Sequence, residues 1–325
     1  MVDTASIREE FKEYLIGQNI QSQPRGLYDP VNYIMNTGGK HIRATFLLLA
    51  YSLYQKKRSS IAFNCAYAIE LFHNFSLVHD DIMDDADTRR GQPSVHTKYS
   101  VSSGILSGDV MLILVYETLL KIPDELKRAK ILSLFTQTAK EVCEGQQYDI
   151  DFETKQGVTK EDYLLMIKLK TAVLLACSLK IGAILGGASD TDADCLYDFG
   201  VNIGIAFQIQ DDMLDTYGIQ SQVGKLIGGD IQQGKKTILY LTAIDEMKNG
   251  KSEFKSLYDS NLKIEEKLPK VTELMDACQV KEKVNLRKDA YLEKALLALN
   301  NIDSNNIQVI NELSNLAKFM VERSH

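Results

Sequence analysis

The 325-residue sequence is poor in several residue types whose abundance marks particular classes of protein. It has no tryptophan and only five prolines, so proline-rich linkers and long disordered tracts are not expected. Its five cysteines form no Cys-x-x-Cys pair and leave one over, which argues against a disulfide framework and a zinc site. Basic residues are outnumbered, and the formal net charge of −7 argues against a general nucleic-acid binder, because such a protein needs a basic face.

The sequence also lacks a recognisable targeting or membrane-spanning segment. The amino-terminal stretch MVDTASIREEFKEYL carries acidic residues early and has no apolar core, unlike a signal peptide. The most apolar stretch, residues 172–188, is interrupted by Lys180 and is short for a bilayer. Together with the scattered cysteines, these features predict a cytoplasmic protein without a transmembrane helix.

What the sequence does contain is helical periodicity. Apolar residues recur at spacings of three and four, whereas alternation by two is scarce, so a nearly all-α protein is predicted. The segments with the strongest pattern are 61–83, 101–121, 128–147, 160–185 and 192–217. The first is apolar on almost every side, which is typical of a helix in the middle of a bundle. The more charged region beyond about residue 250 is also predicted to be helical.

One short motif, Asp-Asp-x-x-Asp, occurs twice. Its copies are Asp80, Asp81 and Asp84, and Asp211, Asp212 and Asp215. In a helix, positions four apart share a face, so each copy presents two carboxylates that repel one another unless a cation lies between them. Each copy follows an apolar helix and is expected near its carboxyl end, where the helix dipole disfavours further negative charge.

A single acidic run is equally consistent with a solvated surface. Two copies, each at the end of a helix too apolar for the surface, favour helices that pack together and bring the carboxylates into one site. Such a set of hard oxygen ligands, without cysteine, selects Mg²⁺ or Mn²⁺ over Zn²⁺. Magnesium held by few carboxylates completes its octahedron with water and phosphate oxygens, so a phosphorylated substrate is expected.

Basic residues near the motifs support phosphate binding. Each of them alone is more often solvated or part of a surface ion pair than a ligand, but together they suit more than one diphosphate. They are Lys40, Arg43, Arg89, Arg90, Lys170, Lys225, Lys235 and Lys236. The last three belong to a glycine-rich segment, residues 218–237, that is predicted to be a mobile loop able to close over an anion.

These residues resemble the trans-isoprenyl diphosphate synthases, the head-to-tail prenyltransferase family that includes farnesyl and geranylgeranyl diphosphate synthases. The resemblance spans roughly residues 38–237 and rests on GGKHIR, LFHNFSLVHDDIMDDADTRRG, EGQQYDID, KLKTA, FQIQDDMLD and GKLIGGDIQQGKKT. It implies an all-α fold, an isoprenoid-synthase-type antiparallel helix bundle around a deep central cavity. It also implies a single prenyltransferase domain over residues 1–325 and a homodimer.

The resemblance further implies a role for each matching residue. Asp80, Asp84 and Asp211 would bind Mg²⁺ directly, in a site for three ions that could also accept Mn²⁺, with Asp81 and Asp215 supporting them. The allylic diphosphate would be held by Arg89, Lys170, Thr171, Gln208, Lys225 and Lys235. Isopentenyl diphosphate would be held by Lys40, Arg43, His73 and Arg90. The residues that would act directly on the ionising bond are Asp80, Asp84, Asp211, Lys170 and Arg89.

The implied chemistry is consistent with the charges present. Cleavage of the carbon–oxygen bond of an allylic diphosphate places negative charge on the leaving group, where metal ions and lysines stabilise it. The double bond of isopentenyl diphosphate then attacks the carbocation, and loss of a proton gives a chain longer by one isoprene unit. Because the departing diphosphate is thought to take this proton in the family, no protein residue is assigned as an obligatory base.

Several residues keep two interpretations. His79, Gln146 and Asp149 are candidates for either the site or structural hydrogen bonds. Phe75 and Ser76, five and four residues before the first motif, would set product length, although Phe75 could equally be core packing. The resemblance implies that an aromatic residue at that position marks a short-chain synthase. The first motif lacks the two-residue insertion of many bacterial farnesyl synthases, which favours geranylgeranyl over farnesyl diphosphate as the product.

Two rival functions remain open from sequence. A class I terpene cyclase also ionises a prenyl diphosphate, but it normally pairs its aspartate motif with an Asn/Ser/Glu triad rather than with a second Asp-Asp-x-x-Asp. A non-catalytic regulatory subunit of a prenyl synthase tends to lose aspartates, whereas both motifs here are intact.

Overall fold

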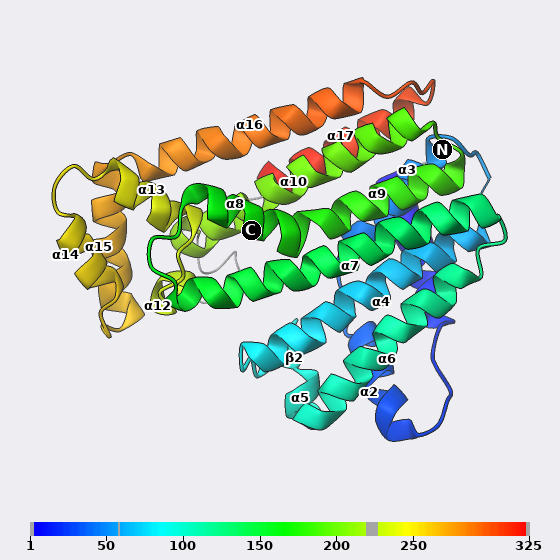
Figure 1. Cartoon of the computed structure of the whole chain (residues 1–325), viewed down its shortest axis with the longest axis horizontal. Coiled ribbons are helices and arrows are strands. Elements are labelled where there is room, and N and C mark those ends of the chain that lie inside the picture. Colours follow the sequence, from blue (N-terminus) through cyan, green and yellow to red (C-terminus); the bar gives the residue numbers. More distant parts are fainter. Residues whose placement is uncertain (1–2, 58, 219–226, 323–325) are drawn as a thin grey trace. The chain divides into compact units, whose positions relative to one another are not determined.

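The computed structural model of the chain describes residues 3–57, 59–218 and 227–322. Within these ranges the chain is almost entirely helical, and strands β1 (Thr88–Arg89) and β2 (Gln92–Pro93) form one short antiparallel hairpin. The all-α class expected from the periodicity is confirmed (Figure 1).

The chain divides into two compact units. The first comprises Met1–Thr136, Cys177–Leu196 and Asp303–Leu313, and the second comprises Gln137–Ala176, Tyr197–Ile302 and Ser314–His325. Four of the five boundaries between the units fall inside helices, namely α7 (Glu125–Thr154), α9 (Val173–Gly186), α10 (Asp190–Tyr217) and α17 (Ile307–Glu322). The fifth lies between residues 302 and 303, ahead of α17. A single domain over residues 1–325 stays a prediction.

The first unit is built around the long apolar helix predicted from the sequence. Its helices are α1 (Thr4–Ile16), α2 (Arg25–Asn36), α3 (Ile42–Ser52), α4 (Ser60–Met83), α5 (Val95–Lys98) and α6 (Val101–Leu120). Helix α4 packs along α6 and also against α3 (Figure 1). Two glycines of α6 permit this close packing, because a Cβ on Gly104 or Gly108 would lie 2.8 Å from Ile82 or 2.2 Å from His79 of α4.

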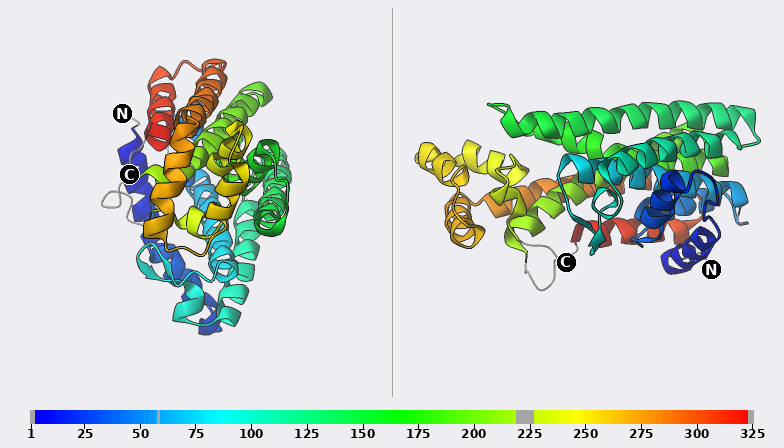
Figure 2. Two further views of the ribbon diagram at one scale, coloured as in Figure 1. Left: turned by 90° about the vertical axis from the view of Figure 1, so that its left-hand side faces the viewer. Right: turned by 90° about the horizontal axis from the view of Figure 1, so that it is seen from below.

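The second unit contains most of the chain beyond residue 136. Its remaining helical elements are α8 (Lys160–Ile167), η1 (Lys168–Ala172), α12 (Gly229–Gln232), α13 (Ile238–Glu246), α14 (Lys251–Tyr258), α15 (Ile264–Ala277) and α16 (Val280–Asn300). One apolar core joins them and includes Ile209, Met213, Phe254 and Val271. Helices α14 and α15, in the region predicted to be helical despite weak periodicity, lie side by side (Figure 2).

The segment predicted as one helix over residues 160–185 is interrupted. It begins with a capping box, in which Thr159 Oγ1 accepts from the backbone of Asp162 and Asp162 Oδ2 accepts from the backbone of Thr159. It then widens into a π-helical turn, η1, before continuing as α9. Such π-turns inside helices are often found at functional sites.

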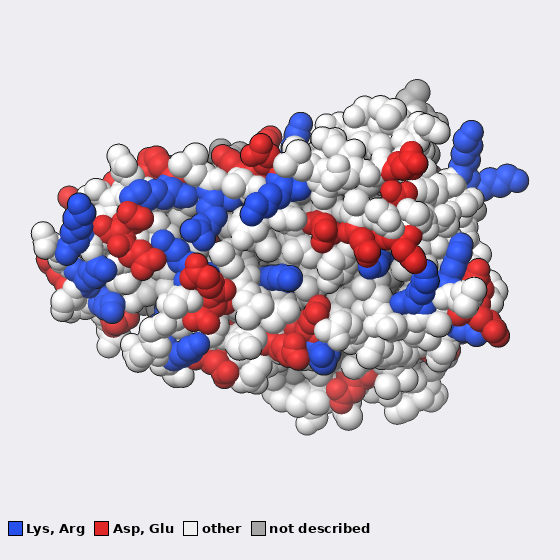
Figure 3. Space-filling view, turned by 45° about the horizontal axis from the view of Figure 1, so that its top comes forward, with Lys and Arg blue, Asp and Glu red and all other residues white. Residues whose placement is uncertain are grey.

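The described ranges contain one helix, α6, that is long and apolar enough to cross a membrane by length and composition. Core and interface helices of other proteins share these properties, so the expected lack of a transmembrane helix stays a prediction. Elsewhere, acidic and basic side chains are interspersed over the face drawn in Figure 3.

Candidate active site

The first aspartate motif lies at the carboxyl end of α4, as predicted. Asp80 and Asp81 belong to its last turn, and Asp84 is the C-cap residue, whose backbone N–H donates to Asp80 O at 2.8 Å. Asp81 is fully buried and accepts two hydrogen bonds from Arg89, one of them from Nε at 2.8 Å. Arg89 Nη2 also lies 3.8 Å from Asp80 Oδ2, so this arginine is part of the motif's surroundings.

Opposite charges balance one another around Asp81. Burial raises the pKa of Asp81, and the guanidinium of Arg89 opposes that rise. For Arg89, burial lowers the pKa, but the hydrogen bond to Asp81 and the charges of Asp81, Asp80 and Asp84 outweigh it and leave the pKa raised. Asp81 Oδ2 is buried without a hydrogen-bond partner, so the motif retains acceptor capacity for a cation or a bound water.

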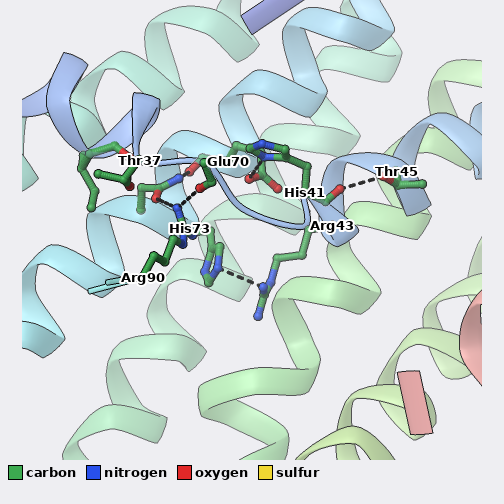
Figure 4. A network of polar contacts seen from close by, with 10 residues as sticks. Thr37, His41, Arg43, Thr45, Glu70, His73 and Arg90 are labelled. Atoms are coloured by element: carbon green, nitrogen blue, oxygen red, sulfur yellow. Dashed lines mark hydrogen bonds and ion pairs between the residues drawn. The ribbon is translucent and has the colours of Figure 1, made fainter. Parts of the chain in front are cut away.

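The residues predicted to hold isopentenyl diphosphate gather around the GGKHIR turn (Figure 4). Arg43 Nη1 lies 3.1 Å from His73 Nε2. Arg90 Nη1 donates to Gly38 O, and it lies 3.4 Å from Asn74 Oδ1. Lys40 is an exposed residue of the same turn. The structure thus brings Arg43, His73 and Arg90 together within the first unit.

His73 in this cluster is a neutral acceptor rather than a cation. Burial, together with the nearby charges of Arg43 and Arg90, lowers its pKa well below 6.5, so that Nε2 can accept from Arg43. Burial also lowers the pKa of both arginines, and the charge of Glu70 opposes this in each case. The sequence motifs did not point to Glu70, although an acidic residue inside an otherwise apolar helix is itself a signal of a functional or structural role.

The second motif lies near the carboxyl end of α10, again as predicted. Its middle residue, Asp212, is buried; Tyr163 Oη donates to one carboxylate oxygen, and Gln208 Nε2 lies 3.3 Å from the other. Asp215 Oδ2 accepts from the backbone N–H of Asp230 at 3.0 Å. Both motifs therefore bury their middle aspartate against a donor and leave the outer aspartates less buried.

Carboxylates crowd this part of the second unit. Burial and the charge of Asp230 raise the pKa of Asp212, and they raise that of Asp215 to about 6. Removing like charges from water in this way is unfavourable, and a divalent cation would relieve it. Among the described residues, no group of three or more His, Cys, Asp or Glu side chains could hold a metal ion by itself. Hard oxygens that need further ligands from water and phosphate suit Mg²⁺.

A cavity of about 120 Å³ lies beside the second motif. The residues predicted to hold the allylic diphosphate within the second unit line it, namely Lys170, Thr171, Gln208 and Lys235, together with Asp149, Asp212 and Asp230. Lys170 Nζ forms an ion pair with Asp149 Oδ2 at 2.6 Å, which identifies the partner of a residue whose role the sequence left open. Lys225, also predicted for this set, lies outside the described residues.

The two lysines that end the glycine-rich segment differ in their surroundings. Lys235 lines the cavity, 3.9 Å from Asp230 Oδ1, and its carbonyl accepts from Tyr258 Oη of α14 at 2.6 Å. Lys236 donates to the backbone carbonyls of Phe152, Glu153 and Lys155 at 2.7 to 3.1 Å, and so it caps the carboxyl end of α7.

Lys170 and Thr171 both belong to the π-helical turn η1. Glycines of two neighbouring helices allow this wider turn to fit. A Cβ on Gly145 of α7 would lie 2.3 Å from the Lys170 backbone nitrogen, and one on Gly204 of α10 would lie 2.5 Å from Ala172 Cα. Glycine is needed at both positions because the opposing atoms are backbone.

The residues predicted to limit product length lie one turn before the first motif. The Phe75 ring contacts Phe72 and His79, with centroids 5.4 and 4.9 Å apart. Ser76 Oγ donates to His73 O at 2.8 Å. His79 Nε2 lies 3.1 Å from Ile105 O of α6, so its ring is held between Phe75 and the neighbouring helix.

Comparison with known proteins places these residues in a family. Residues 24–275 match the family model described as Polyprenyl synthetase. A geranylgeranyl diphosphate synthase of Methanosarcina mazei is 42% identical over 226 residues, which are 69% of each chain. A geranylfarnesyl diphosphate synthase of Natronomonas pharaonis is 38% identical over 258 residues, 74% of this chain and 76% of the relative. A crystal structure of a geranylgeranyl pyrophosphate synthase aligns over 100% of both chains, with 39% identity and a TM-score of 0.94.

The matched region contains both aspartate motifs and the GGKHIR turn. Its length and the identities confirm the family expected from the sequence, whose members are prenyl diphosphate synthases that generally depend on a divalent metal. The chain therefore belongs to the polyprenyl synthetase family, within which it is a short-chain trans-prenyltransferase.

Proposed function

We propose that the enzyme condenses isopentenyl diphosphate head to tail with an allylic diphosphate and releases geranylgeranyl diphosphate as its main product. The observation that carries this proposal is the presence of two separate cationic clusters, one in each unit. One is formed by Arg43 and Arg90, and the other is formed by Lys170 and Lys235 beside the second motif. An enzyme that joins two diphosphates needs two such anion sites.

The donor set suits divalent metal. Asp80, Asp84 and Asp211 would hold Mg²⁺, in a site for three ions, with Asp215 and Asp81 supporting them. When bound, the metal neutralises the diphosphate of the allylic substrate and stabilises the charge that develops as that group leaves. This role requires the two motifs to approach one another across a bound diphosphate, which stays a prediction.

The chain's own residues then account for binding and orientation. Lys170 and Arg89 would hold the departing diphosphate through charge-assisted hydrogen bonds, with Thr171 and Gln208 as neutral donors. Arg43, Arg90 and Lys40 would fix isopentenyl diphosphate so that its double bond faces the allylic carbon, and this orientation removes much of the entropic barrier to coupling. The proton released at the end passes to the diphosphate, so no protein base is required.

The proposed product length is based on the position of Phe75 and on the products of the related enzymes. The compared enzymes are named for C20 and C25 products, which supports a short-chain product without fixing its size. Phe75 is buried, and its ring contacts Phe72 and His79. These contacts hold the ring in place, so it would block further elongation of a product chain that reaches it. We therefore retain geranylgeranyl diphosphate over farnesyl diphosphate.

The proposed enzyme is a cytoplasmic homodimer that uses α6 at its interface. Leu106, Ile113 and Leu120 lie seven residues apart on α6 and are 58%, 64% and 57% exposed. Residues at this spacing share one helical face, and an apolar face of this kind is typical of a contact with another helix. Asp109, with its side chain 62% exposed, interrupts the same helix and would be unfavourable in lipid, which supports a protein partner.

One incubation tests the proposed reaction. The purified protein is mixed with isopentenyl diphosphate, farnesyl diphosphate and Mg²⁺, and the products are sized by chromatography after removal of phosphate. Geranylgeraniol is expected, and chelation of the metal should abolish its formation. Cyclic hydrocarbons would instead identify a terpene cyclase, and no turnover with any allylic primer would identify a non-catalytic subunit.

Matched variants test the assigned carboxylates. Asp80→Asn and Asp211→Asn should each lower kcat by roughly 10²-fold or more, because each removes a charge that holds the metal against the leaving group. Asp190→Asn is the control, since Asp190 is exposed and pairs only with Lys130 among the ion pairs of the described chain. Wild-type kcat in Asp80→Asn or Asp211→Asn would contradict the assignment.

A further inference from the structure

His41 has a backbone conformation that residues other than glycine seldom adopt. As the N-cap of α3 it is left-handed, with φ 45° and ψ 39°. Gly38 and Gly39 before it also have positive φ, 78° and 151°, so the chain turns sharply just ahead of α3. Glycine takes such angles without strain, whereas a histidine needs specific contacts to hold it there.

Those contacts are present. His41 is 8% exposed, its Nδ1 lies 3.0 Å from Glu70 Oε2, and its ring meets Phe11 edge-on with centroids 5.7 Å apart. Its carbonyl accepts from both the backbone N–H and the hydroxyl of Thr45, at 2.9 and 2.8 Å. Glu70 is 2% exposed, and a buried carboxylate needs a donor, so we assign His41 Nδ1 as that donor.

The turn of residues 38–43 packs against one face of α4 (Figure 4). Glu70, His73 and Asn74 are spaced i, i+3 and i+4, and therefore project from the same side of the helix. Glu70 contacts His41, His73 contacts Arg43 at 3.1 Å, and Asn74 lies 3.4 Å from Arg90. The three contacts hold the turn and both arginines against one face of α4.

The turn and Arg90 also touch directly. Arg90 donates to Gly38 O, and a Cβ on Gly39 would come within 3.3 Å of Arg90 Cζ. The charge of Glu70 acts on both guanidinium groups, because it opposes the effect of burial on Arg43 and on Arg90 alike. The position of the Glu70 carboxylate therefore influences both guanidinium groups, and His41 Nδ1 contacts this carboxylate.

We propose that His41 is a positioning residue for the isopentenyl diphosphate site. Its ring orients the Glu70 carboxylate and anchors the turn of residues 38–43, and through them it sets the separation of Arg43 and Arg90. This inference rests on the proposed function, since it takes the two arginines as ligands of isopentenyl diphosphate. His41 itself touches neither substrate.

The test compares three variants. His41→Leu removes the donor to Glu70 and places a branched side chain in the left-handed conformation. His41→Asn keeps an amide donor on a residue that tolerates this conformation. Gln279→Leu is the control, because Gln279 is an exposed left-handed N-cap residue of α16, with φ 56°, far in sequence from the turn. It carries the same backbone strain without the contact to Glu70.

Steady-state kinetics give the decisive comparison. His41→Leu should raise KM for isopentenyl diphosphate about tenfold, as expected for loss of a hydrogen bond to a charged group, and leave KM for the allylic substrate within about twofold. His41→Asn should restore most of the loss, and Gln279→Leu should match wild type in both constants. An unchanged KM for isopentenyl diphosphate in His41→Leu, or equal rises in both constants, would overturn the proposal.

When turnover is too low for kinetics, calorimetric titration measures the binding of isopentenyl diphosphate directly and separates the role of His41 from the proposed function. If wild type binds this substrate and folded His41→Leu binds it equally well, only the role of His41 is wrong. If wild type does not bind it, the proposed function fails and the inference fails with it. Should His41→Leu not fold, Glu70→Ala replaces it, because it removes the carboxylate that His41 orients. Unchanged affinity of this folded variant for isopentenyl diphosphate would again overturn the proposal.

Discussion

The middle aspartate of each motif differs physically from its neighbours. Asp81 and Asp212 are 0% and 4% exposed, and each is held by one strong donor, Arg89 or Tyr163. A carboxylate this buried is stable only with such a partner. Both oxygens of Asp212 accept a hydrogen bond, whereas in Asp81 Oδ1 accepts from Arg89 and Oδ2 has no partner. Asp80, Asp84 and Asp211 are less buried, which agrees with the direct metal-binding roles that the family resemblance implies for these three residues.

The partly buried imidazole of His73 predicts a pH effect on stability. Its folded-state pKa is lowered below 6.5, so at lower pH the unfolded chain takes up a proton that the native protein excludes. The free energy of unfolding should therefore fall as the pH drops below about 6.5, by up to about 1 kcal/mol per pH unit from this residue. Urea unfolding measures this effect: between pH 7 and pH 5, the free energy of unfolding should fall less in His73→Gln than in wild type. Equal losses would contradict this assignment.

Substitution of Phe75 tests whether this single ring limits product length. Phe75→Ala should lengthen the products beyond C20, because it removes the side chain expected to block the growing chain, and chromatography of the dephosphorylated products measures the change. Phe63→Ala is the control, since Phe63 is an aromatic residue of the same helix that contacts Phe11 and Tyr14 instead. An unchanged chain-length distribution in Phe75→Ala would show that Phe75 does not set product length.

At the scale of elements, the π-helical turn η1 depends on its neighbours. Gly145→Ala or Gly204→Ala should push the backbone of residues 168–172 outward, because no opposing side chain can move aside. Each change should lower the free energy of unfolding by about 1–3 kcal/mol and raise KM for the allylic substrate more than KM for isopentenyl diphosphate. Thermal melts and kinetics measure the two effects.

Gly26→Ala in α2 is the matched control for these glycines. A Cβ there meets no atom within 4 Å, and Gly26 does not have positive φ, so stability should be unchanged or slightly raised. If Gly145→Ala and Gly204→Ala behaved like Gly26→Ala, the close approach of the helices would not matter for the site.

The elements themselves were largely predictable. The helix expected over 61–83 is α4, and the segments 101–121 and 192–217 correspond to α6 and α10. The periodicity of apolar residues carries this information locally. The π-turn was not predictable, since it depends on glycines in two other helices, and neither was the short α12 inside the segment 218–237, which is supported by Lys267 Nζ donating to Ile231 O at 3.0 Å.

The whole molecule is expected to dimerise through α6. Ile113→Asp should weaken the dimer and raise the fraction of monomer in sedimentation velocity at micromolar concentration, because a charge in an apolar contact is left without water or a partner. Leu286→Glu is the control, since Leu286 is 71% exposed on α16. A wild-type protein that sediments as a monomer, or an unaffected Ile113→Asp dimer, would exclude this interface.

The sequence by itself determined the helical class, the positions of both aspartate motifs at helix ends, and the family, because periodicity and motif spacing are local properties of the chain. It also named the cations of both clusters. Only the tertiary structure decided which groups partner them. Glu70 and His41 support the arginines, Tyr163 holds Asp212, and Lys236 caps a helix while Lys235 faces the cavity. These pairings join residues distant in sequence, and burial and distance become defined only when the helices pack.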